Sequence, residues 1–129
     1  MSQSLSNVII HIIFSTKDRR PFLADKDIRE QMHAELGGTS KTLNCPPIIA
    51  GGVEDHIHFL ARQSRTITLA DWIKELKRVT SIWIKEKGPQ FKDFGWQAGY
   101  GAFIGQPVAI SPRHRIHPES GRTPQEEEF

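Results

Sequence analysis

The sequence predicts an α+β domain in which two β-α-β units share one antiparallel sheet. Three observations predict this class: a β-branched and aromatic run over residues 8–15, two segments with apolar residues at helical spacing, and two apolar runs joined by a glycine pair between residues 47 and 62. With 129 residues, the chain is long enough for one hydrophobic core and too short for two.

The first strand is expected over residues 8–15 and the first helix soon after it. The strand is apolar on both faces apart from His11, which indicates a central strand covered on both sides. Asp25 is a suitable N-terminal cap for a helix that starts near Ala24, and the glycine pair 37–38 is expected to end that helix.

Residues 47–62 are expected to form a hairpin with paired histidines. The pattern indicates a strand, a turn at the glycine pair 51–52, and a second strand to about residue 62. Because side chains alternate along a strand, His56 and His58 share one face, where two imidazoles can bind a divalent cation. The acidic pair 54–55 favours this interpretation. The alternative is two solvent-facing histidines on a half-buried strand.

His11 would join the pair if the first and third strands are neighbours. This also requires the other strand face, with Ile57 and Phe59, to pack under the helices. The alternative is a hydrogen-bonded core histidine with no ligand role.

The second helix is expected from Thr68, which forms a capping box with Asp71, to the Gly88-Pro89 pair. An apolar stripe at helical spacing predicts its buried side: Leu69, Trp72, Ile73, Leu76, Val79 or Thr80, and Trp83. Basic residues on the other side are candidates for contact with a DNA backbone: Lys74, Lys77, Arg78 and Lys85. The alternative is an ordinary solvated face.

A last strand, or strand pair, is expected over residues 94–103, which completes a β-α-β-β-α-β order. That order is the split β-α-β arrangement of a ferredoxin-like or RNA-recognition-motif-like domain. Four prolines between residues 106 and 129 predict an irregular tail without a helix of ordinary length. We therefore expect a folded domain at residues 1–105 and a Pro-rich tail at residues 106–129.

Composition adds few constraints on function. A formal net charge of +2 is too small to indicate a partner, and the single Cys45 excludes an internal disulfide. No apolar run approaches the ~20 residues of a membrane span, and the N-terminus has no signal-peptide pattern. A cytoplasmic protein is expected.

Four blocks in order give the chain a resemblance to a known family: residues 14–21 (FSTKDRRP), 51–58 (GGVEDHIH), 81–84 (SIWI) and 94–103 (FGWQAGYGAF). Together they resemble the HUH-type single-tyrosine transposases of bacterial insertion sequences and their relatives associated with repetitive palindromes. The resemblance runs from about residue 8 to residue 103.

This resemblance implies a ferredoxin-like fold, a homodimer whose sheets join, and an enzyme that cuts and rejoins single-stranded DNA at hairpin ends. It implies His56 and His58 as ligands of Mg²⁺ or Mn²⁺ at the scissile phosphate. In the family, a tyrosine on a C-terminal helix attacks the phosphate and forms a phosphotyrosine link, and a glutamine four residues later completes the metal site.

The sequence departs from this family at the nucleophile. Its one tyrosine, Tyr100, matches the family's Gly-Tyr-Gly-Ala-Phe strand, and no tyrosine stands near Ser111 to Arg113, where the nucleophile is expected. A pair of compensating frameshifts would account for this divergent stretch. We expect a transposase with impaired cleavage. One alternative is a non-catalytic binder of single-stranded or hairpin DNA, and another is a small metal-binding or dimeric structural protein.

Overall fold

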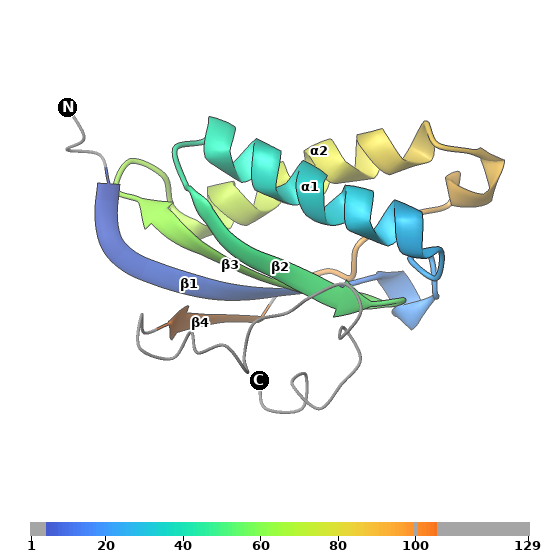
Figure 1. Ribbon diagram of the computed structural model, residues 1–129, viewed down its shortest axis with the longest axis horizontal. Coiled ribbons are helices and arrows are strands. Elements are labelled where there is room, and N and C mark those ends of the chain that lie inside the picture. The colour runs from blue at the N-terminus through green and yellow to red at the C-terminus, as the bar shows by residue number, and fades with distance from the viewer. Residues whose placement is uncertain (1–4, 100, 106–129) are drawn as a thin grey trace.

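The computed structural model describes residues 5–99 and 101–105, which form two layers (Figure 1). One layer is a sheet of four strands: β1 (Leu5–Ser15), β2 (Pro47–Val53), β3 (His56–Ser64) and β4 (Gly101–Gly105). The other layer contains the helices α1 (Lys26–Thr42) and α2 (Leu69–Lys85), which cover one face of the sheet. Two short 3-10 turns, η2 (Lys17–Arg19) and η3 (Pro89–Phe91), complete the described elements.

The strand order in the sheet is β2-β3-β1-β4, and every pairing is antiparallel. Together with the chain order β-α-β-β-α-β, this is a ferredoxin-like arrangement, so the predicted fold class is confirmed. β1 and β3 are the central strands, as the apolar first strand indicated. Neither helix in the described part of the chain is long and apolar enough to cross a membrane.

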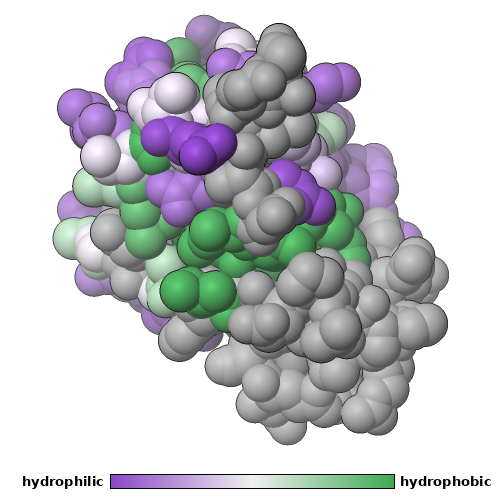
Figure 2. Space-filling model, turned by 90° about the vertical axis from the view of Figure 1, so that its left-hand side faces the viewer, coloured by the Kyte–Doolittle hydropathy of each residue, from purple (hydrophilic) through white to green (hydrophobic). Residues whose placement is uncertain are grey.

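The hydrophobic core lies between the helices and the sheet. Ile12 and Phe14 of β1 are buried beside Ile57 and Phe59 of β3, on the face that the helices cover. The helices contribute Met32, Leu36, Trp72, Ile73, Leu76 and Ile84. Toward the end of the molecule where α1 finishes and α2 begins, hydrophilic side chains lie over the helices and apolar ones beneath them (Figure 2).

The prediction that α1 stops at the glycine pair 37–38 is wrong, although Asp25 is its N-terminal cap as expected. Each of the two interior glycines reduces helix stability by roughly 1 kcal/mol relative to alanine, so tertiary contacts must stabilise the last turn of the helix. Ser40 makes such contacts, because its buried hydroxyl donates to the Cys45 carbonyl at 2.6 Å and accepts from the Trp72 indole at 3.0 Å.

The turn of the β2–β3 hairpin also differs from the prediction. Gly51 and Gly52 lie inside β2, opposite His58 and Ile57, and the turn is formed by Glu54 and Asp55. A Cβ on Gly52 would overlap the His56 carbonyl oxygen and crowd the Ile57 Cα. The glycine is therefore required by close strand approach and not by turn geometry.

α2 begins and packs as its sequence predicted. The Thr68 hydroxyl accepts the Asp71 amide at 3.1 Å, which caps the helix. At the alternative position in the apolar stripe, Thr80 is the buried residue. Its hydroxyl donates to the Leu76 carbonyl at 2.6 Å and accepts the Trp96 indole N–H at 3.0 Å. Trp83 is only partly buried, and Ile84 takes the core position beside it.

A continuous strand over residues 94–103 is not formed. Trp96 makes an isolated bridge with Thr16, and regular pairing with β1 begins only at Gly101. Between these points, Gln97 donates its amide to the Ser15 carbonyl at 2.7 Å, and Gly99 has a positive φ of 79°. This conformation turns the chain out of strand geometry before β4.

Candidate functional site

The paired histidines lie on the sheet face opposite the helices. Along β3, Ile57 and Phe59 enter the core, so His56 and His58 point the other way. His11 is on this same face of the neighbouring β1, as predicted for the arrangement in which β1 and β3 are adjacent. Only 8% of His11 and 3% of His58 are exposed.

Direct contacts join these three imidazoles. His11 Nε2 lies 3.0 Å from His58 Nδ1, within hydrogen-bonding distance. The ring centroids of His11 and His58 are 5.2 Å apart, and so are those of His56 and His58. His11 therefore lies beside the paired histidines, as one expectation had it, and is a buried hydrogen-bonded histidine, as the other had it.

Asp55 contacts the imidazole of His56. Its Oδ1 lies 2.9 Å from His56 Nδ1, and because a carboxylate only accepts, His56 must donate from Nδ1. On its other oxygen, Asp55 pairs with Arg19 Nε at 3.2 Å. Burial raises the pKa of the Asp55 carboxyl, but the hydrogen bonds and charges of His56 and Arg19 outweigh it, and the pKa lies below its usual value.

The backbone around this turn is fastened to η2 and the chain on either side of it. The Asp55 carbonyl accepts the Thr16 amide at 3.0 Å, and the Glu54 carbonyl accepts the Leu23 amide at 2.9 Å. Arg19 itself has a φ of 55°, which is uncommon for a residue other than glycine, asparagine or aspartate. These backbone hydrogen bonds fasten the turn that carries Asp55 to the segment that follows β1.

The buried imidazoles are neutral at neutral pH. Burial lowers the pKa of His11 to about 4. Burial lowers the pKa of His58 to about 3, with smaller contributions from the charges of His11 and His56. Neutral imidazole is the form that binds a metal ion.

These side chains fit part of a cation site. Two imidazoles on one strand face are suitable nitrogen donors for a divalent ion. However, no group of three or more His, Cys, Asp or Glu side chains in the described ranges is arranged to hold a metal. His56 and His58 would supply two ligands of such a site, and any further ligands would have to come from DNA, water or other parts of the chain.

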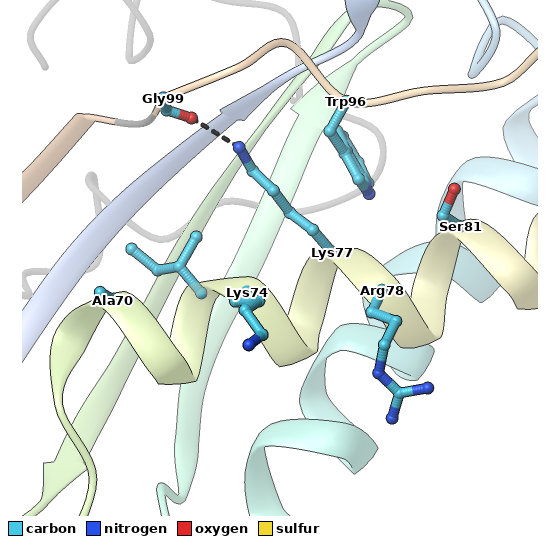
Figure 3. Close-up of a pocket in the computed structure, with 8 residues that line it drawn as sticks. Ala70, Lys74, Lys77, Arg78, Ser81, Trp96 and Gly99 are labelled. Atoms are coloured by element: carbon cyan, nitrogen blue, oxygen red, sulfur yellow. Dashed lines mark hydrogen bonds between the residues drawn. The ribbon is translucent and has the colours of Figure 1, made fainter.

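Three of the four predicted basic residues of α2 lie at a groove of about 500 Å³ between the helix and the segment that leads to β4 (Figure 3). Lys74, Lys77 and Arg78 line it together with Ser81, Trp96 and Gly99. Lys85 does not line this groove, although it follows Lys74 and Arg78 at spacings that place all three on one side of the helix.

Two of the groove's three cations already have protein partners. Lys77 donates its ammonium to the carbonyl oxygens of Gln97 at 2.8 Å and of Gly99 at 2.5 Å, and burial lowers its pKa. Arg78 forms a two-pronged pair with Glu75, at 2.7 Å and 3.1 Å. Lys77 therefore acts first as a tie between α2 and the segment leading to β4, a role that the sequence did not indicate.

The structure does not bring the two predicted sites together. Helix α2 covers one face of the sheet (Figure 1). The histidine side chains point to the other face, since Ile57 and Phe59 of the same strand enter the core. Sequence reasoning noted the acidic pair 54–55 but assigned no role to Arg19 or to the contacts of Gln97 and Gly99. The only sequence signal for Arg19 was its place in the block shared with the transposases.

Comparisons with known proteins agree with this fold. A family model described as "Transposase IS200 like" matches residues 4–111. A Deinococcus radiodurans R1 protein assigned as a transposase superimposes with a TM-score of 0.70 and 17% identity, over 83% of this chain and 85% of that chain. A REP-associated tyrosine transposase bound to a REP hairpin gives a TM-score of 0.59 and 12% identity, over 86% of this chain and 64% of that chain. The search of curated proteins found no significant match.

The fold and the site define a ferredoxin-like domain with a histidine cluster on the sheet face away from the helices. Because the family model spans most of the sequence, the chain belongs to the IS200-like transposase family. The resemblance recognised from four short blocks is therefore confirmed. At such low identities, the two solved structures confirm the fold alone.

Proposed function

We propose that this transposase-family chain binds hairpin ends of single-stranded DNA and holds Mg²⁺ or Mn²⁺ at His56 and His58. Family membership and the REP hairpin bound by a protein of similar fold support the DNA partner. One observation carries the metal assignment. The two imidazoles share a strand face, and each has its Nδ1 in contact with a neighbouring side chain, which leaves Nε2 as the nitrogen that would meet a cation.

A divalent cation bound there polarises phosphoryl oxygens and offsets charge that develops at a scissile phosphate. Two protein ligands predict weak affinity. We expect Mn²⁺ binding to be lost in both His56→Ala and His58→Ala. Equal Mn²⁺ binding by the wild type and by the double variant would contradict the site.

The groove beside α2 is the proposed DNA contact. Lys74 is its most available cation, since Arg78 must exchange Glu75 for a phosphate and Lys77 must release two carbonyl groups. Lys85 extends the basic side of the helix beyond the groove. Neutralised phosphates release counterions, so hairpin affinity should fall steeply as salt rises.

Strand cleavage is proposed to be impaired in this chain. The expected tyrosine near Ser111 is absent, and an unassisted serine hydroxyl is a far weaker nucleophile than a tyrosine phenol with a pKa of about 10. Tyr100 and residues 106–129 lie outside the described residues. The absent tyrosine also favours a second candidate function, a DNA-binding protein of the family with no catalytic activity.

Two further proposals concern organisation. We assign the folded transposase-like domain to residues 1–105 and the irregular tail to residues 106–129, and we propose a homodimer, as the family resemblance implies. Closed two-fold dimers are the commonest protein assemblies. Light scattering at micromolar concentration should give twice the chain mass of 14.7 kDa, and a monomer mass would contradict the proposal.

The experiment for DNA binding compares a labelled hairpin with an unstructured strand of equal length and composition. We expect tighter binding of the hairpin, and weaker binding on Lys74→Glu, with a smaller salt slope. Lys41→Glu is the matched control, because Lys41 is an exposed lysine at the end of α1 that does not line the groove. Equal affinity for both DNAs, or equal losses in both variants, would overturn the hairpin proposal.

A further inference from the structure

We propose that His11 is a positioning residue that fixes the tautomer of His58 and so directs His58 Nε2 toward a divalent cation. This inference rests on the proposed cation site, and it assigns a role to a residue outside the His56–His58 pair. It begins from the 3.0 Å contact between His11 Nε2 and His58 Nδ1.

The direction of this hydrogen bond decides which nitrogen of a neutral His58 ring keeps a lone pair. A neutral ring carries one proton, so one nitrogen donates and the other has a lone pair for an acceptor role or a metal. If His58 donates from Nδ1 to His11, its Nε2 lone pair is available to a cation. If His11 donates instead, His58 carries its proton on Nε2, where it cannot bind a metal.

His56 makes a similar hydrogen bond from its Nδ1, and there the donor is known. Asp55 accepts from His56 Nδ1 at 2.9 Å, and a carboxylate cannot donate in return. A neutral His56 ring therefore has its lone pair on Nε2. A cation that binds both histidines from one side requires the same tautomer at His58, and His11 is placed to accept that proton.

Location supports a positioning role over a purely packing one. His11 belongs to β1, a different strand from both proposed ligands, and its ring crosses to His58 from the diagonal position, since His11 is paired with Leu60 and His58 with Ile13. Both rings are almost completely buried, so water competes little for the hydrogen bond. Partners of this kind orient metal-binding histidines, and their loss typically weakens metal affinity by roughly 10–100-fold.

The first test measures the tautomer without metal. In protein labelled with ¹⁵N-histidine, long-range ¹H–¹⁵N correlation spectra distinguish protonated from unprotonated ring nitrogens. We expect His58 to be protonated on Nδ1 in the wild type and to populate both tautomers in His11→Leu. A His58 ring protonated on Nε2 in the wild type would overturn the inference.

The second test measures Mn²⁺ affinity by electron paramagnetic resonance. His11→Leu removes the acceptor and should weaken Mn²⁺ binding by about 10–100-fold. His11→Gln keeps an acceptor oxygen near the place of Nε2 and should bind Mn²⁺ close to the wild-type affinity. Wild-type affinity in His11→Leu, or equal losses in both variants, would contradict the positioning role.

These measurements separate the inference from the proposed function. If the wild type binds no Mn²⁺, the cation site fails, and the role of His11 at that site fails with it. If the wild type binds Mn²⁺ and loses it in His58→Ala but not in His11→Leu, the cation site stands and only the role of His11 fails. Circular dichroism of each variant checks folding, and the wild-type spectrum gives the tautomer even if a variant does not fold.

Discussion

Replacing Lys77 by methionine tests whether this residue ties the molecule together or serves mainly as a DNA contact. The ammonium of Lys77 donates to the carbonyl oxygens of Gln97 and Gly99, on the segment that connects the Trp96 bridge to β4. Methionine keeps the length and apolar stem of the side chain but removes all three donors. The substitution therefore leaves two carbonyl groups without this partner.

The expected cost follows from the kind of hydrogen bond lost. Hydrogen bonds to charged groups contribute roughly 1.5–3 kcal/mol each when they are well shielded. Both bonds of Lys77 lie near the surface, where water can replace the lost donor. We therefore expect Lys77→Met to lower the free energy of unfolding by about 1–2 kcal/mol in total.

Urea unfolding, followed by tryptophan fluorescence, measures this difference from the midpoint and slope of the transition. Lys74→Met is the matched control, because Lys74 lies one turn away on the same helix and should change stability by less than about 0.5 kcal/mol. Equal stabilities of the two variants, with hairpin binding abolished only in Lys77→Met, would refute the structural role of Lys77.

Three other predictions test the strand contact, the buried imidazole of His33 and the separation of the two sites. Gly52→Ala should destabilise the fold by about 1–3 kcal/mol in urea unfolding, since the new Cβ would meet the backbone of β3. Gly38→Ala, whose Cβ would meet open space in a helix, should stabilise the fold by about 0.5–1 kcal/mol. Equal effects of the two substitutions would contradict the close approach of β2 and β3 at Gly52. Burial, aided by the charge of Arg29, lowers the pKa of His33 to about 4. The unfolded chain therefore binds a proton that the folded one does not, and the free energy of unfolding decreases as pH falls from about 6.5 to 4. His33→Leu should remove up to about 3 kcal/mol of this decrease, and parallel pH–stability curves for the two proteins would count against the prediction. Lys74→Glu should weaken hairpin binding with unchanged Mn²⁺ affinity by electron paramagnetic resonance, because the groove and the histidines lie on opposite sides of the sheet, and a joint loss would show that they are coupled.

The sequence predicted the elements well wherever local pattern and tertiary packing favour the same structure. The apolar stripe of α2 and the alternation around His56 are of this kind, and both lie as expected. Two predictions based on glycine were wrong, the helix end at residues 37–38 and the hairpin turn at residues 51–52. In each case a glycine normally read as a breaker is accommodated by a contact distant in sequence, the packing of Ser40 in one and the approach of β3 in the other.

The site was predictable in its ligands and only partly in its supporting contacts. Period-two alternation is enough to place His56 and His58 on one face. The partnership of His11 with His58 depends on strand register, which a single sequence does not fix. The Lys77 tie depends on the path of residues 97–99, and a helical pattern of basic residues cannot distinguish a structural lysine from a DNA-binding one.

The most direct test of the proposed function is incubation of wild-type protein with a labelled single-stranded hairpin and Mn²⁺, followed by native and denaturing gels. The native gel should show a shifted hairpin, and the denaturing gel should show neither cleaved strand nor covalent protein–DNA adduct, because the expected tyrosine is absent. A covalent adduct that Tyr100→Phe eliminates would contradict the account and identify the chain as a working nuclease.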